Sequence, residues 1–454
     1  MKQSLFAKHA LLGDGWAKNV RLSWNLNGDL ATVQAGAIAL PHEVQQGYVL
    51  PGMINLHSHA FQRAMAGMTE IAGEGPDSFW TWRDLMYRYA LHITPSQMQA
   101  IAAQLYAECL RHGYTAVCEF HYLHRAPDGA FYANMAETAA RVIAAANASG
   151  IGISMLPVLY SHADFNDQPL RSDQRRFSTD VEQILQLIQQ LESSRNAQVE
   201  IGVAPHSLRA ANVGQISALV AALPKTRPIH IHLAEQQREV DACLAATGKR
   251  PVELLLETQQ LDQRWCLVHA THLNPAEVAG IAASGAVAGI CTSTEGNLGD
   301  GFFPLPDYIA AQGQFGIGSD SHVSHSPIEE LRWLEYGQRL RLQGRNIAQV
   351  AGQRRVGDFL WQACLQGGAK ASGRQVGQLA VGKRADLLIL DDQHPNLQDL
   401  PAAEVLNTWI FAGNDNLVRD VIVGGKLVVR AGRHVEQERI QREYVACMRE
   451  LRRL

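Results

Sequence analysis

The chain has 454 residues, of which 46% are hydrophobic, so it can hold one large domain and a smaller one around a sizeable core. A formal net charge of -4 argues against a nucleic-acid-binding surface. The first residues lack the apolar region of a signal peptide, and no uncharged stretch is long enough to span a membrane. The seven cysteines form no Cys-x-x-Cys pair, which favours reduced thiols. We expect a soluble cytoplasmic protein with neither a nucleic acid nor a membrane as its partner.

Short strand patterns mark both ends of the chain. They are separated by Gly and Asn turns, and Gly424-Gly425 is typical of a hairpin. The two ends are therefore predicted to form one small β-domain that the rest of the chain interrupts. The predicted strands are 4–7, 20–23, 31–33, 385–391, 418–423 and 426–429.

The middle of the chain alternates between apolar strand patterns and helical patterns. Such alternation indicates a parallel sheet covered by helices. After a first strand ending at His57, the strand segments are 114–121, 151–159, 199–205, 229–234, 265–270, 286–291 and 315–319. Helical patterns occupy 95–112, 133–148, 180–193, 211–222, 236–247 and 275–283. Eight strands predict a (β/α)8 barrel, with a doubly wound open sheet as the alternative.

Two further segments stand outside this alternation. The connection 60–94 is long and rich in Gly and aromatic residues, which suggests a functional segment packed over something. At the far end, 436–454 has the pattern of an amphipathic, basic helix, and we expect it to dock on the surface.

Histidines and acidic residues follow the predicted strands at their C-terminal ends. His57 and His59 are two residues apart, so both side chains point to the same side of an extended strand. In a barrel the carboxyl ends of all strands meet on one face. Three histidines and one carboxylate there would hold a zinc-like ion and leave room for water, whose proton a nearby Glu can transfer. The other strand-end segments are Glu119–Tyr122, His206–Arg209, His232–Glu235, His269–His272 and Ser319–His322.

These motifs resemble the amidohydrolase superfamily over nearly the whole chain. Pro51-Gly52 before His57-x-His59 matches its first-strand signature, and the segment 382–387 resembles its return into a small β-sandwich. The resemblance implies one divalent ion per chain, most simply Zn²⁺, because 199–206 lacks the lysine of two-metal members. It implies metal ligands at His57, His59, His232 and Asp320. It also implies a β-sandwich of 1–50 and 378–435, a (β/α)8 catalytic barrel of 51–377 and a terminal helix of 436–454.

Within the superfamily, His232-Leu-Ala-Glu235 resembles the deaminases. There the resemblance implies catalytic roles for Glu235, His269 and Asp320. Segments 57–63, 79–83, 229–236, 265–272 and 294–301 are similar to the N-formimidoyl-L-glutamate deiminases of histidine degradation. Such a deiminase would release ammonia from a small dicarboxylate and leave N-formyl-L-glutamate, and a homodimer is expected. Arginines suit the two carboxylates. The expected substrate-binding residues are Gln62, Arg83, Tyr122, His206 and Arg209.

Other histidines receive different interpretations. His230 alternates with His232 and should face the core, and His272 should lie in a loop. No ligand position remains for His121, whereas His322 and His325 follow Asp320 and stay open as its neighbours.

Two other functions remain open at this point. One is a deaminase of an aromatic base such as guanine or cytosine, whose pocket should offer stacking groups and amides. The other is a catalytically inactive barrel scaffold, against which the intact set of ligand-type residues argues.

Overall fold

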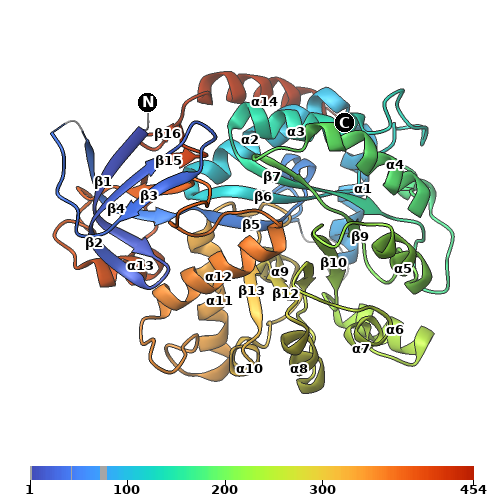
Figure 1. Ribbon diagram of the computed structural model, residues 1–454. Coiled ribbons are helices and arrows are strands. Elements are labelled where there is room, and N and C mark those ends of the chain that lie inside the picture. The colour runs from blue at the N-terminus through green and yellow to red at the C-terminus, as the bar shows by residue number, and fades with distance from the viewer. Residues whose placement is uncertain (1–2, 42, 72–78, 454) are drawn as a thin grey trace.

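A computed structural model describes residues 3–41, 43–71 and 79–453 (Figure 1). Its N- and C-terminal segments form one eight-stranded sheet, which Figure 1 shows in blue and red on one side of the molecule. The strand order is β17-β16-β15-β14-β4-β1-β2-β3, so the two ends pair through β4 and β14. The bounds are β1 Gln3–Leu12, β2 Gly15–Trp24, β3 Leu30–Gln34, β4 Val44–Pro51, β14 Leu387–Leu390, β15 Val418–Val423, β16 Lys426–Arg430 and β17 Arg433–His434.

This sheet has a hydrophobic core of its own. Leu22 and Trp24 from one end of the chain and Leu387 from the other are among its buried side chains. The joint β-domain that the chain ends predict is therefore present. In the described part of the chain its strands form one eight-stranded sheet, and the sandwich stays a prediction.

Four parallel strands, β5 to β8, form a second sheet in the order of the chain. Their bounds are β5 Met53–Ser58, β6 Tyr114–His121, β7 Gly152–Leu159 and β8 Val199–Ile201, and the short β9, Ala204–Pro205, pairs with β7. A third sheet, β10-β11-β12-β13, is also parallel, with bounds Ile229–Leu233, Trp265–His269, Val287–Ile290 and Gln314–Ile317. All the strands predicted for the middle of the chain are present, and the segment 199–205 is split in two.

Isolated parallel bridges connect these two sheets on both sides. Val203 pairs with Ile229 at the start of β10, and Ser58 at the end of β5 pairs with Asp320 beyond β13. The amide nitrogens of Ser319 and Asp320 also donate to the carbonyl of His57. The first and last parallel strands are thereby joined at the end where the chemistry-bearing residues lie.

Helices lie between and around the parallel strands (Figure 1). The six helical predictions are matched within a few residues at each end. The helices between β5 and β10 are α1 Phe79–His92, α2 Pro95–His112, α3 Glu137–Ser149, α4 Val181–Leu191 and α5 Val213–Ala221. Those between β10 and β13 are α6 Gln237–Thr247, α7 Pro251–Thr258, α8 Pro275–Ser284, α9 Thr292–Leu298 and α10 Leu305–Ala310. After β13 come α11 Pro327–Leu342, α12 Val356–Ser372, α13 Val405–Phe411 and α14 Gln437–Leu451.

Local sequence explains where α2 begins and ends. Thr94 caps it through a capping box with Gln97, and Pro95 occupies its first turn. Gly113 ends it with φ 108°, a left-handed conformation that glycine adopts without strain. The next residue begins β6, so the helix returns the chain directly to the sheet.

The connection 60–94 is more structured than its composition suggested. It contains the 3-10 helix η1, Ala60–Ala64, and most of its second half is α1. Arg83, expected in a loop, therefore lies on a helix. The glycine-rich part of this connection, 73–76, lies outside the described residues.

The C-terminal segment is helical as expected, and α14 packs along α2 (Figure 1). The seven cysteines are buried and unpaired. None of the helices in the described ranges is long and apolar enough to cross a membrane.

Candidate metal centre and substrate pocket

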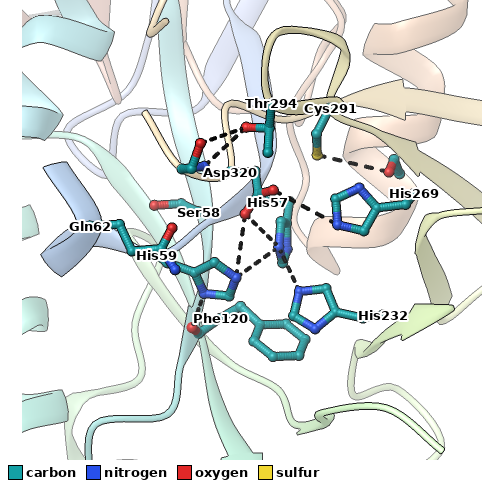
Figure 2. A network of polar contacts seen from close by, with 12 residues as sticks. His57, Ser58, His59, Gln62, Phe120, His232, His269, Cys291, Thr294 and Asp320 are labelled. Atoms are coloured by element: carbon teal, nitrogen blue, oxygen red, sulfur yellow. Dashed lines mark hydrogen bonds and ion pairs between the residues drawn. The ribbon is translucent and has the colours of Figure 1, made fainter. Parts of the chain in front are cut away.

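Three histidines and one aspartate meet where β5, β10 and β13 end. His57 is on β5, His59 follows it, His232 is on β10 and Asp320 follows β13. Figure 2 shows the three imidazoles facing one another beside the Asp320 carboxylate. Parallel strands bring these residues together because their carboxyl ends lie on the same side of the sheet.

The potential ligand atoms of this group, which we call the His3Asp cluster, converge closely. The Nε2 atom of His57 lies 3.1 Å from that of His59 and 3.0 Å from that of His232. Asp320 Oδ1 lies 3.4 Å from Nε2 of both His57 and His59. All four side chains are buried. The atoms are arranged around one point, as the ligands of a single ion would be.

Hydrogen bonds define which imidazole nitrogens face that point. Nδ1 of His59 donates to the Phe120 carbonyl at 2.8 Å, and Nδ1 of His232 donates to the His206 carbonyl at 3.1 Å. Each Nε2 is then left as an acceptor with its lone pair directed into the cluster. Burial lowers the pKa of His57 to about 3, so this imidazole is neutral as well. Three buried imidazole nitrogens about 3 Å apart next to a carboxylate are a donor set that fits a metal ion.

A buried hydrogen-bond network supports the strand that carries two of the histidines. Ser58, between His57 and His59, donates to Glu119 at 2.5 Å, and the same carboxylate accepts from the Ala60 amide and the Tyr106 hydroxyl. This network joins β5, which carries His57, to β6 and α2.

The backbone is strained at two of these strand ends. His269 and Asp320 have φ of 67° and 45°, in the left-handed region that non-glycine residues seldom adopt. Such conformations cost about 1–3 kcal/mol each and concentrate at functional sites. The two strained residues are those whose side chains point toward the cluster.

His269 and Glu235 lie beside the cluster. His269 Nε2 is 3.6 Å from a Glu235 carboxylate oxygen and 3.8 Å from Asp320 Oδ2. Burial raises the pKa of Glu235 to about 7, which suits a group that gains and loses a proton near neutral pH. His269 Nδ1 faces Glu295 at 3.3 Å, which orients the ring.

A pocket that is partly open to solvent leads to the cluster. It brings together every substrate-binding residue expected from the sequence: Gln62, Arg83, Tyr122, His206 and Arg209. Gln62 donates to the Tyr122 hydroxyl at 2.8 Å. The Nε atom of Arg209 is buried without a hydrogen-bond partner among the described residues. The pocket therefore combines a metal-type cluster, a glutamate–histidine pair and two guanidinium groups.

Aromatic side chains form much of the remaining pocket wall. The hydroxyl of Tyr160 accepts a hydrogen bond from Gln174 at 2.9 Å, and the guanidinium of Arg83 lies 5.5 Å from the ring centre of Tyr87. The other aromatic residues lining the pocket are Trp82, Tyr122 and Phe177.

The remaining histidines behave mostly as expected. His230 is buried and contacts the Ala371 carbonyl at 2.8 Å, away from the cluster, and His121 contacts Thr138 instead of an ion site. His272 contacts the Asp300 carbonyl at 2.8 Å. Of the two left open, His322 joins the network through Ser58 and Ser319, and His325 packs against His112.

Sequence reasoning missed four acidic or amide residues near the site. Glu119 was noted only as a strand end, whereas Gln236, Glu295 and Asp300 stood inside quoted motifs without a role of their own. Asp300 lies with Glu235 and His269, close enough for their ligand-type atoms to fall within 4.8 Å of one another. The repeated occurrence of acidic residues in Thr294–Gly301 was the available signal.

A parallel α/β fold with histidines and a carboxylate gathered at its strand ends defines a class of hydrolases, and comparison with known families agrees. Residues 48–428 match the Amidohydrolase family, and the chain belongs to this family. Residues 2–47 match the model described as Formimidoylglutamate deiminase HutF, N-terminal domain.

Individual relatives match most or nearly all of the chain. It is 54% identical to the formimidoylglutamate deiminase of Pseudomonas aeruginosa over 99% of both chains. It is 28% identical to the 8-oxoguanine deaminase of the same organism, over 83% of this chain and 81% of the relative. The crystal structure of an amidohydrolase from Brucella melitensis superposes with a TM-score of 0.94 at 43% identity, covering 99% of both chains.

Proposed function

We propose that this protein is a hydrolytic deiminase of histidine degradation that converts N-formimidoyl-L-glutamate and water to N-formyl-L-glutamate and ammonia. The observation that carries the proposal is the pair Arg83 and Arg209 in the pocket beside the His3Asp cluster. The Nε atom of Arg209 is buried without a hydrogen-bond partner among the described residues, which suits an anionic ligand, and this substrate has two carboxylates. The high identity to a formimidoylglutamate deiminase over the full chain supports the same substrate.

The proposed cofactor is one divalent ion per chain, held by His57, His59, His232 and Asp320. Three imidazoles and a carboxylate are typical zinc ligands, so Zn²⁺ is the proposed ion. At this place it supplies a Lewis acid that lowers the pKa of a water molecule toward neutrality.

The proposed chemistry uses three side chains of the protein. Asp320 or Glu235 accepts a proton from the attacking water, and His269 hydrogen-bonds the attacking oxygen as it adds to the formimidoyl carbon. Glu235 then gives this proton to the imine nitrogen, takes the hydroxyl proton of the resulting tetrahedral centre, and passes that second proton to the departing amine. The carbon–nitrogen bond breaks, and the products are the formyl group and ammonia. Its pKa near 7 allows Glu235 both to accept and to return the proton.

The pocket residues are proposed to bind and orient the substrate. Arg83 and Arg209 pair with the carboxylates, while Gln62, Tyr122 and His206 surround the formimidoyl end near the cluster. Since the two arginines come from α1 and from the loop between β9 and α5, the distance between them would select the length of the substrate.

We propose further that the two parallel sheets form one closed (β/α)8 barrel, 51–377. The bridges Val203–Ile229 and Ser58–Asp320 support closure. The small domain, 1–50 and 378–435, is proposed to fold over as a β-sandwich, with 436–454 as a separate helix. Hydrogen bonds from Leu30 to Lys383 and from Ala385 to Gly28 support this folding because they join the edge strand region of β3 to the segment before β14.

We also propose that the protein is cytoplasmic and forms a homodimer. Seven buried, unpaired thiols support a cytoplasmic enzyme. A homodimer is proposed because α11 exposes Trp333, Tyr336 and Leu340 on one face, an apolar surface that a second copy would cover. Sedimentation equilibrium with a Leu340→Glu variant tests it: a monomeric wild-type protein would refute the dimer.

Ammonia release tests the substrate. N-formimidoyl-L-glutamate should be hydrolysed, whereas guanine, cytosine and adenosine analogues should not. The analogue N-formimidoyl-4-aminobutyrate, which lacks one carboxylate, isolates the contribution of the second arginine contact and should react at least about tenfold less efficiently. The Glu235→Gln protein serves as the control for ammonia that is released without catalysis. Turnover of an aromatic base at a higher kcat/KM would instead support the base deaminase, for which the aromatic wall of the pocket is suited.

A further inference from the structure

A second group of metal-type side chains lies next to the His3Asp cluster. It consists of Glu235 after β10, His269 at the end of β11 and Asp300 after α9, and we call it the Glu-His-Asp cluster. One ligand-type atom of each lies within 4.8 Å of the other two, and all three side chains are buried. None of the three is among the four ligands proposed for the first ion.

The hydrogen bonds around this cluster leave one ligand atom on each side chain available. His269 directs Nδ1 to Glu295 at 3.3 Å, so its Nε2 faces Glu235 at 3.6 Å. One oxygen of Asp300 accepts from the side-chain amide of Gln236, while Oδ2 is buried without a partner among the described residues. Only 4% of Asp300 is exposed to solvent, so water does not replace the missing partner from outside.

The negative charge of the two carboxylates also favours a bound cation. The Glu235 and Asp300 carboxylates are both buried with ligand-type oxygens within 4.8 Å of each other, and the cluster holds a single imidazole, which Glu295 also contacts. Buried carboxylates persist when they are protonated, paired or bound to a metal. An imidazole nitrogen with two carboxylate oxygens is a ligand set that Zn²⁺ uses in three-residue sites, where water completes the coordination.

We propose that the Glu-His-Asp cluster is a second, weaker Zn²⁺ site and that an ion bound there inhibits the enzyme. The site is weaker because it offers three ligands, whereas the His3Asp cluster offers four. Inhibition rests on the proposed catalytic roles, since the ion would occupy the atoms of Glu235 and His269 that handle protons. Binding of the second ion rests on the geometry alone. An experiment can therefore test binding and inhibition separately.

The test counts bound zinc in the holoenzyme. Protein carrying one tightly bound Zn²⁺ is dialysed against buffers of rising free Zn²⁺, and bound metal is measured by elemental analysis. Wild-type protein should take up a second equivalent, and initial rates should fall over the same range of free Zn²⁺. Asp300→Asn should weaken the second binding event at least tenfold and leave the first equivalent in place. Glu235→Gln should do the same from the opposite side of the cluster.

Asp386→Asn is the matched control. Asp386 is also buried and also has an unpartnered Oδ2, but it lies before β14 and accepts from the Gly424 amide at 2.7 Å. It should leave the second binding event unchanged. If wild-type protein never binds more than one zinc ion per chain, the proposal is wrong, and this result does not depend on how the variants fold. A second equivalent that Asp300→Asn binds as tightly also overturns the proposal and would point to another group such as His269, Cys291 and Asp320. Second-site binding with undiminished rates would remove the inhibition claim only.

Discussion

The Nε2 atoms of His57 and His232 lie 3.0 Å apart, although 175 positions separate the two residues in the chain. The Nδ1 atom of His232 carries the proton that the His206 carbonyl accepts, so the lone pair on its Nε2 atom faces His57. This close approach is the geometry expected of two ligands that bind the same ion.

Replacing His232 should remove the metal, whereas replacing its neighbour His230 should not. His232→Asn loses a direct ligand, so the affinity for metal should fall by more than the roughly 10–100-fold typical of outer partners. His230→Asn is the matched control, because that side chain faces Ala371 from the same strand. Elemental analysis after gel filtration measures the loss. Wild-type protein with two tightly bound ions would contradict the single-ion assignment.

Removing either pocket arginine should weaken the use of substrate without removing the metal. Truncating an arginine that pairs with a buried carboxylate costs about 2–5 kcal/mol, so Arg83→Ala and Arg209→Ala should lower kcat/KM tenfold or more. The exposed Arg341 on α11 provides the control, Arg341→Ala. Full activity in both pocket variants would refute recognition of a dicarboxylate.

Glu235→Gln should bind metal and substrate but turn over at least a hundredfold more slowly. The change removes the proton transfer and keeps the size of the side chain, and general acid–base catalysis contributes about 10²–10⁴-fold. Single-turnover kinetics together with metal analysis separate slow chemistry from lost metal. If more than a tenth of the wild-type kcat remained, the proton would have to pass through another group, of which His269 is the nearest candidate.

Gly318→Ala should destabilise the protein and loosen its metal. A Cβ atom at Gly318 would lie 2.7 Å from both the Cβ and the backbone nitrogen of His57, so β13 could not keep its distance from β5. Overpacking of this kind costs about 1–3 kcal/mol. Gly296→Ala on α9 is the control, since no other side chain or non-local backbone atom lies within 4 Å of its added Cβ. Urea unfolding and zinc retention measure the two effects, and equal behaviour of the two variants would refute the argument.

Glu119→Gln should lower the free energy of unfolding by about 1–3 kcal/mol, the usual penalty for leaving a buried group unsatisfied. Three donors, from Ser58, Ala60 and Tyr106, point at the carboxylate, and an amide offers them only one oxygen. The part-exposed Glu137, whose carboxylate pairs with Arg141, supplies the control Glu137→Gln. An unchanged urea midpoint in Glu119→Gln would show that the network contributes little.

The sequence by itself determined which strands exist and which residues stand at their ends. Strand patterns are local, and a separation of two places His57 and His59 on one side regardless of the rest of the fold. Since parallel strands carry their carboxyl ends to one side, the meeting of His232, His269 and Asp320 with them could also be inferred before any coordinates.

Only the tertiary structure decided what the loops and helices bring to those strand ends. Asp300 and Gln236 meet because two connections after different strands fold over the same face, a contact that no local pattern encodes. Arg83 reaches the pocket from a helix inside a segment whose composition resembled a loop. The single sheet of the two chain ends likewise depends on β4 pairing with β14. Such contacts depend on packing between elements distant in the chain, and composition and periodicity do not specify which elements meet.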